Sequence, residues 1–469
     1  MGRGRRITHQ GHSVTPTAPA DERDAGEPAG PAPGSAPARE QSLLDETTER
    51  DAHLPATGGS RAAGEAFAAQ PAQENAGPGG LTGSPAPAVD RAAAAAVGAD
   101  LASEHQASLE AAHEARERHA DQELPDDPGS YLAHPEAFQR VYQQARDRIA
   151  AGQDAVPFMT EDATGGLGAR GTGRGFGVEI EFDFPPGMSP EERRQAKTAI
   201  GRDLRAAGLT RTANQRGYHA AAGRGYSDAP NGWSFENDAT VAGEIVSPIM
   251  YDEPRSWENL RQVTEIVRRH GGIASARTGG HVHVGLHDYD HTVENHSRLM
   301  RTTAAYEDVL FRLAANPERG EHRGTSWCRP NTVPADGYAD VSAARARNLG
   351  HGLAVNLQHV NGRASDHAEF RMWDGSLDPA VIQTQIKVSL GLVDCALRTA
   401  RTPDAVPAGT RHQLGHHRRQ FGRRRQSGEA WRASTHSFRD LADRLFTRPQ
   451  DRDQATALFA VTRWQGQRA

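Results

Sequence analysis

The sequence predicts an α+β fold in which helices pack on one side of an antiparallel sheet and the other side stays open and polar. Four strand-like segments alternate apolar with polar residues, a pattern typical of strands that bury only one face. Segments with helical apolar spacing and helix-capping residues lie between them, in the order β-α-β-α-β-α-β-α. The polar strand faces argue against a parallel sheet covered on both sides.

The composition predicts that only part of the 469-residue chain is folded. Hydrophobic residues make up 36 % and aromatic residues 6 %, with 49 Gly and 28 Pro, and the apolar deficit is concentrated at the N-terminus. Residues 1–128 bury too little apolar surface to offset their ordering entropy, so we expect disorder there, which could include a lone helix at about 90–123. Three further parts are expected: a helix and flexible linker at 129–173, the sheet domain at 174–400, and a basic segment with a C-terminal helix at 401–469.

Charge and cysteine content disfavour several classes of protein. The net charge of −6 gives no general attraction to nucleic acid or to membranes. Cys328 and Cys395 are too few for a disulfide framework, which fits a reducing compartment. The N-terminus lacks the apolar core of a secretory signal, and no run approaches the roughly 18 apolar residues of a membrane span. We therefore expect a cytoplasmic protein that acts on neither membranes nor nucleic acid; its oligomeric state is left open.

The first predicted strand, within 175–184, has an apolar back and an acidic front. Its apolar members occupy every second position: Phe176, Val178, Ile180, Phe182 and Phe184. Between them stand Gly177, Glu179, Glu181 and Asp183, so three carboxylates share one face. At about 7 Å spacing these carboxylates repel one another. A cationic group is expected to offset them.

The other elements follow in order. A helix is expected at 131–151, before the first strand. Ser189, with Pro190 and Glu192, forms a capping-box pattern that begins a helix ending near 208. We further expect strands and turns at 226–246, a helix capped by Ser256 and ended by Gly271, and a strand within 273–287. A helix at 293–315 and strands at 353–360 and 367–373 follow. The last two expected elements are a helix capped by Asp378 and running to about 398, and a final helix containing Phe438, Leu441, Leu445 and Phe446.

Three later strand-like segments also present reactive groups on one face. Glu244 heads a short apolar run, His281 and His283 alternate with valines, and Glu369, Arg371 and Trp373 alternate with Phe370 and Met372. Carboxylates with an imidazole suit a hard cation such as Mg²⁺ or Mn²⁺, and Arg suits a phosphate or carboxylate. Each segment alone could be a solvated strand face, a surface His pair or an ion pair. All four together favour a shared metal and anion site.

These motifs resemble the amidoligase family, part of the glutamine synthetase and glutamate–cysteine ligase superfamily of ATP-dependent carboxylate–amine ligases. In order they are Glu179-x-Glu181, Asp238, Glu244-Ile-Val-Ser-Pro, Gly280-His-x-His283-x-Gly, and Glu369-Phe-Arg371 with Asp374-Gly-Ser-Leu-Asp378. The resemblance covers roughly residues 174–400 and is specific only as a set. It implies a glutamine-synthetase-like catalytic domain on a partial antiparallel barrel.

The resemblance also implies a reaction and a set of roles. ATP would phosphorylate a carboxylate, and an amine would attack the acyl-phosphate; the substrates would be small molecules, peptides or cell-wall-type fragments. The implied metal ligands, for Mg²⁺ or Mn²⁺, are Glu179, Glu181, Glu244, His281 and Glu369. His283 would face the nucleotide phosphates, Arg371 would steady the transferred phosphoryl group, and Asp238 would order the amine or a metal-bound water. No adenine pocket can be aligned; Arg329, Lys387 or the arginines after 411 could supply further positive charge.

Other functions remain open. A same-fold phosphotransferase, a catalytically degenerate binding module and another metal-dependent β-barrel enzyme of the cupin type would share parts of the pattern. A cupin places a Glu a few residues after His-x-His, whereas His287 and Asp288 follow here. Gly166-x-Gly168-x-x-Gly171 has the letters of a dinucleotide motif but precedes a strand, which argues against one. The arginine-rich stretch 411–425 is either a solvated tail or a clamp for an acidic substrate or nucleic acid.

Overall fold

The computed structural model describes residues 106, 109–110, 113, 129–160, 167–219, 229–290, 292–315, 328–331, 333–334, 337–363, 365–398 and 428–462. The chain divides into two compact units, Met1–Pro85 and Ala86–Ala469, and all of these residues belong to the second. The disorder predicted for 1–128 lies outside the described residues, apart from four helical positions within the predicted lone helix. The arginine-rich stretch 411–425 also lies outside them. The predicted boundaries between the four parts of the chain stay predictions.

The described part of the chain contains one six-stranded sheet, and every strand pair in it is antiparallel. The strand order is β2-β3-β1-β4-β6-β5, so the sheet is open, with β2 and β5 at its edges. The strands are β1 (Phe176–Phe182), β2 (Ser234–Glu236), β3 (Gly243–Val246), β4 (Gly279–Gly285), β5 (Val355–Asn356) and β6 (His367–Asp374). The predicted α+β class with an antiparallel sheet is confirmed.

Most of the described helices lie in the intervals that the apolar spacing indicated, and two at 341–347 and 449–461 were not predicted. They are α3 (Pro135–Ala150), α4 (Pro190–Ala206), α5 (Pro254–Arg269), α6 (Val293–Ala305), α7 (Glu307–Leu313), α8 (Val341–Arg347), α9 (Pro379–Leu397), α11 (Gly428–Leu445) and α12 (Pro449–Val461), with a 3-10 turn, η1 (Arg170–Thr172). The Ser189 capping box of α4 is present in both directions, and the side chain of Asp378 caps α9 by accepting from Ala380 N. These two predicted helix starts are confirmed.

Three helix predictions need correction. Ser256 does not cap α5: Pro254 occupies the first turn, where its fixed φ suits a helix start, and Glu253 is the N-cap. The helix expected at 293–315 is broken at Tyr306 into α6 and α7. The helix that begins at Pro449 lacked an evident apolar period and was missed, although most of its residues are buried.

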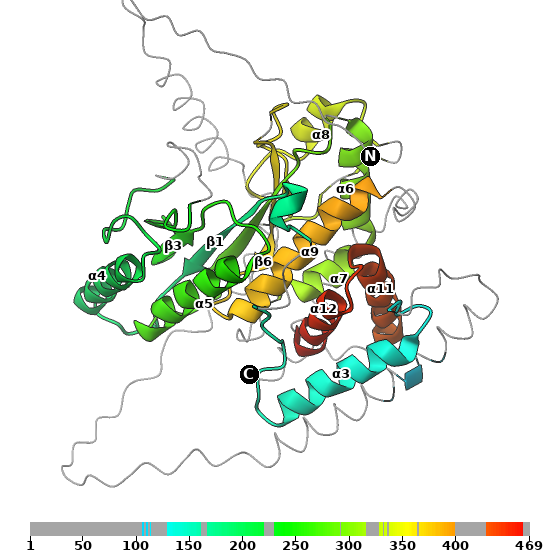
Figure 1. The fold of residues 1–469 in the computed structure, drawn as a ribbon, viewed down its shortest axis with the longest axis horizontal. Helices are drawn as coiled ribbons and strands as arrows, with labels where there is room; N and C mark the ends of the chain where they lie inside the picture. Colours follow the sequence, from blue (N-terminus) through cyan, green and yellow to red (C-terminus); the bar gives the residue numbers. More distant parts are fainter. Residues whose placement is uncertain are drawn as a thin grey trace, which may run out of the picture. The chain divides into compact units, whose positions relative to one another are not determined.

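The apolar back of the sheet packs against α5 and α9, which lie side by side (Figure 1). The Phe176 ring of β1 stacks on Trp257 of α5, with centroids 5.4 Å apart. Helix α9 is long and apolar enough to cross a membrane, yet 89% of its apolar window is buried inside the protein. Its composition therefore reflects a central position in the core.

A β-bulge in β6 overturns the expected direction of one side chain. Gly280 pairs with Trp373 but Val282 pairs with Phe370, so β6 carries an extra residue at this point. The alternation changes there, and Trp373 does not share the front with Glu369 and Arg371. It is buried and donates from Nε1 to Ser389 Oγ on α9, at 3.1 Å.

The N-terminal helix α3 packs with the C-terminal helices α11 and α12 beside α9 (Figure 1). The Phe138 ring of α3 lies 5.9 Å from Phe438 and 6.5 Å from Phe459, and the latter two rings stack at 4.3 Å. Asp443 accepts hydrogen bonds from the backbone N of Tyr131 at 2.9 Å and of Leu132 at 3.0 Å. Helices that precede and follow the sheet in the sequence therefore share one core.

Candidate functional site

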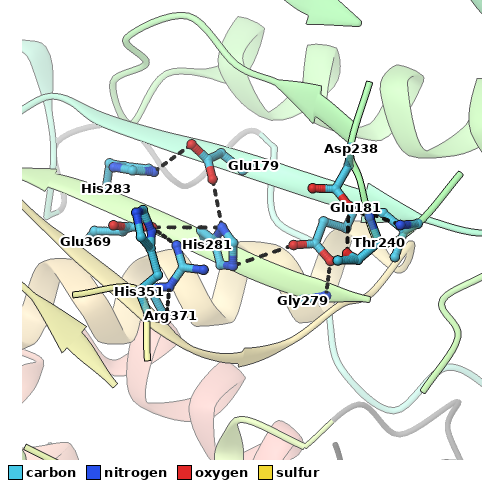
Figure 2. A network of polar contacts seen from close by, with 11 residues as sticks. Glu179, Glu181, Asp238, Thr240, Gly279, His281, His283, His351, Glu369 and Arg371 are labelled. Atoms are coloured by element: carbon cyan, nitrogen blue, oxygen red, sulfur yellow. Dashed lines mark hydrogen bonds and ion pairs between the residues drawn. The ribbon is translucent and has the colours of Figure 1, made fainter. Parts of the chain in front are cut away.

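Strand register brings most of the predicted site residues together on the polar face of the sheet. Glu181 of β1 lies opposite Glu244 of β3. Glu179 lies opposite His281 of β4, and His283 lies opposite Glu369 of β6. Directly paired residues share a face of the sheet, so side chains from four strands converge. Figure 2 shows those of β1, β4 and β6. The period-two pattern alone indicated the face; the pairing supplies the neighbours.

Glu179 is the centre of this cluster. Its Oε2 lies 2.7 Å from His281 Nδ1, and its Oε1 lies 3.2 Å from His283 Nε2 (Figure 2). His281 also reaches Glu181, with 3.7 Å between its Nε2 and Glu181 Oε1. Glu181 in turn accepts a hydrogen bond from Gly279 N, at 2.7 Å. The two histidines of the His-x-His motif therefore both face carboxylates.

The β6 end of the cluster is organised around Glu369. This carboxylate forms an ion pair with Arg371 and accepts from Asn356 Nδ2 of β5 at 2.9 Å. The guanidinium of Arg371 also donates from Nε to the backbone O of His351, at 2.9 Å. Two partners thus fix the orientation of Arg371, leaving the guanidinium beside the carboxylates (Figure 2).

Burial and neighbouring charges push the carboxyl pKa values apart. Burial opposes ionisation of Glu179, but the charge of His283 and hydrogen bonds from the two histidines outweigh it and hold the Glu179 pKa well below 4.5. Burial acts similarly on Glu369, but Arg371 and the histidines lower its pKa to about 2. Burial and then the charges of Glu179 and Glu181 raise the pKa of Glu244 well above 4.5. Glu244 thus lacks enough nearby positive charge to stabilise its ionised form.

Two groups of side chains within the described chain have the donor types and spacing for a metal ion. One is Glu179, Glu244 and His281; the other is Glu179, His283 and Glu369. Within each group the donor atoms lie within 4.8 Å of one another. Glu179 belongs to both. His283, expected at the phosphates, is therefore also a candidate ligand, and Glu181 lies beside the groups rather than in them.

Asp238 is placed differently from the other predicted residues. It follows β2 in a turn, where its Oδ1 accepts from Thr240 N and Thr240 Oγ1, both at 2.6 Å, and from Val241 N at 3.0 Å. This oxygen organises the loop that leads into β3. Its predicted role toward the amine stays a prediction.

Several residues at the site were not anticipated. Glu236 of β2 is buried opposite Glu244 and accepts from Ser234 Oγ at 2.7 Å. The three-residue β2 is too short to show a period.

His359 and His367 lie near His283. His359 comes from a loop and His367 from the first position of β6, so the period-two pattern did not indicate them. Burial, followed by the charges of His283 and His359, lowers the pKa of His367 to about 4.

The two described residues that could supply further positive charge, Lys387 and Arg329, are placed differently. Lys387 is buried on α9, where it forms an ion pair with Asp252, whose other oxygen accepts from Trp257 Nε1 at 2.7 Å. It therefore belongs to the apolar side of the sheet. Arg329 is exposed, and its backbone bridges to Leu353, in the segment whose His351 and Ala354 carbonyls accept from Arg371. Lys387 therefore does not supply free positive charge at the polar face, because Asp252 already neutralises it in the core.

Comparison with known proteins agrees with this geometry. A search of curated proteins finds no match. Residues 172–336, which include β1 to β4 and stop before β6, match the model of one protein family. That family is described as "putative amidoligase enzyme". The chain is similar to it over this stretch, which is less than half of the chain.

Proposed function

We propose that this protein is a carboxylate–amine ligase that uses ATP and Mg²⁺ or Mn²⁺ and acts through an acyl-phosphate. The observation that supports it most directly is the pair of metal-type donor groups that share Glu179; all their members except Glu369 lie in the stretch similar to amidoligases. The substrates would be a carboxylate and an amine, either small molecules or peptides.

The donor chemistry fits divalent cations. Buried carboxylates with single imidazoles suit Mg²⁺ or Mn²⁺, and added positive charge would relieve the repulsion that raises the pKa of Glu244. Glu179, Glu244 and His281 would hold one ion, and Glu179, His283 and Glu369 the other. Such ions, when bound, neutralise phosphate oxygens and so favour phosphoryl transfer.

The reaction would proceed in two balanced steps. The substrate carboxylate takes the γ-phosphoryl group of ATP and releases ADP. The amine nitrogen then attacks the acyl carbon, forming the amide and releasing inorganic phosphate and a proton. Phosphoryl transfer depends mainly on positioning and on charge neutralisation, so a site without a Walker loop is sufficient.

The protein side chains would orient these groups. Arg371, held by Glu369 and the His351 carbonyl, would contact the transferred phosphoryl group. Glu181 would keep His281 in place from one side while its other oxygen is held by Gly279 N. Asp238 would order the amine through its second carboxyl oxygen, because Oδ1 is engaged in the turn.

The test is ADP release by the full chain with Mg²⁺-ATP and pools of amino acids and peptides, with mass spectrometry of the products. Wild type should release ADP only when an acid and an amine are both present, and should form an amide. Glu179→Gln should reduce the rate at least ~100-fold, since it removes charge from both donor groups. Glu191→Gln, on the exposed surface of α4, is the matched control and should keep full activity.

The other outcomes separate the alternatives. ADP formed with the acid alone, together with a stable phosphorylated product, would identify a phosphotransferase. Iron in the purified protein with no ADP release would favour a different metalloenzyme. Silence with all pools and no Mg²⁺-ATP binding by calorimetry would overturn the ligase proposal.

A further inference from the structure

Two imidazole rings, those of His359 and His367, extend the site beyond the proposed metal ligands. His359 and His367 stack face to face, with ring centroids 4.4 Å apart and an interplanar angle of 15°. His367 meets His283 edge-on, with centroids 5.2 Å apart. The rings of His359 and His367 are each only half-buried. A flat aromatic surface therefore remains accessible next to the carboxylate cluster.

Strand register places these rings in a line that leads away from the carboxylates. Along β4, His281 lies opposite Glu179, and His283 follows opposite Glu369. One step further, Gly285 lies opposite His367. The order outward is therefore carboxylates, His283, then the stacked imidazoles. A nucleotide with its phosphates at the carboxylates could extend its other end along this line.

Glycines leave the sheet bare beside the rings. Gly177 precedes Glu179 by two positions and pairs with His283, and Gly285 follows His283 by two positions, so both lie on the site face. A Cβ at Gly177 would come within 3.4 Å of Ser247 Oγ and 4.0 Å of His283 Cβ. Even a small side chain here would take up space next to His283.

We propose that the stacked His359–His367 pair, beside Gly285, holds the base of the nucleoside triphosphate. This inference rests on the proposed function, because it assumes that metal ions held by the carboxylates and His283 would receive the phosphates. Each nucleobase has a π-face, and stacking on an aromatic side chain contributes about 1–3 kcal/mol per base. The pair thus identifies the nucleotide end of the site.

The experiment measures equilibrium binding of a fluorescent ATP analogue, mant-ATP, to the full chain with Mg²⁺. Inorganic tripolyphosphate, which has no base, is measured by competition. His359→Ala and His367→Ala should each weaken mant-ATP binding about 10-fold, in the range of one lost stacking contact, and leave tripolyphosphate binding unchanged. His359→Phe and His367→Phe, which keep a flat ring, should bind mant-ATP within about threefold of wild type. His134→Ala, an exposed histidine before α3, is the control.

The outcomes distinguish this inference from the proposed function. Equal losses for mant-ATP and tripolyphosphate would overturn it, because the rings would then act on phosphates or on folding. Unchanged binding in the alanine variants would also overturn it and leave the ligase proposal standing. Failure of the wild-type chain to bind either probe would overturn both.

Discussion

At the scale of single residues, Glu179 has the largest number of roles at the site. It hydrogen bonds to His281, faces His283 and belongs to both groups of metal-type donors. Its low pKa keeps it ionised at neutral pH, whereas Glu244 has a raised pKa because burial and the charges of Glu179 and Glu181 disfavour its ionisation. Glu179 is thus stabilised as an anion, whereas the ionised form of Glu244 would be stabilised by an added cation.

The membership of Glu179 in both donor groups predicts how metal binding responds to substitution. Titration of the wild-type chain with Mn²⁺, followed by electron paramagnetic resonance of free Mn²⁺, should give two bound ions, one for each donor group. Glu179→Gln should weaken both by at least ~10-fold, because loss of even an outer partner of a ligand costs that much. Glu244→Gln and Glu369→Gln should each weaken mainly one.

Glu265→Gln, on the exposed side of α5, is the control and should bind as wild type does. A Glu179→Gln variant that still binds two Mn²⁺ with unchanged affinity would contradict the assignment of this residue to both groups.

At the scale of single elements, helix starts follow local chemistry. In α4 the Ser189 Oγ accepts from Glu192 N at 3.2 Å, and Glu192 accepts in return from Ser189 N at 2.7 Å. Hydrogen bonding to Ser189 lowers the pKa of Glu192 below 4.5. Because the folded value lies below the unfolded one, the contribution of Glu192 to stability is present above pH 4.5 and is lost as the pH falls through its folded pKa.

Removal of the capping hydroxyl should therefore shift this titration. In Ser189→Ala the carboxyl ¹³C titration of Glu192 should move upward toward 4.5, although the backbone N–H of residue 189 remains. Ser189→Thr keeps a hydroxyl and should leave the pKa near its wild-type value. An unchanged Glu192 pKa in the alanine variant would show that the reciprocal cap is absent in solution.

At the scale of the whole molecule, one buried core joins elements from distant parts of the chain. It includes Phe138 of α3, Phe176 of β1, Leu390 of α9 and Phe459 of α12. The helices α3, α11 and α12 therefore stabilise the sheet through α9 rather than forming a core of their own. The core includes residues on both sides of the predicted boundaries at 173/174 and 400/401.

Phe138→Ala tests that coupling. Loss of a fully buried Phe side chain should lower the free energy of unfolding by about 3–5 kcal/mol, measured by urea denaturation. If the core is shared, fluorescence and circular dichroism should follow a single transition that moves to lower urea. Arg148→Ala, on the exposed face of the same helix, should change stability by no more than ~0.5 kcal/mol. A second transition in the Phe138 variant would instead support separate folding units.

The sequence by itself determined the α+β class, the positions of most strands and the face that carries Glu179, His281 and Glu369. Period-two alternation around Glu179, His281 and Glu369 reports which side of a strand is buried, and capping residues such as Ser189 and Asp378 report helix starts, because both depend on neighbours along the chain. These local signals were sufficient for the α+β class and for a cluster of carboxylates and imidazoles.

Only the tertiary structure decided which of these groups meet. Strand order and register set the pairs Glu179–His281 and His283–Glu369, and the bulge in β6 turned Trp373 toward α9. Chain folding also brought His359 beside His367 and placed Lys387 in the core with Asp252. The physical reason is that these contacts join residues far apart in the sequence, so their energies depend on packing that no local pattern encodes.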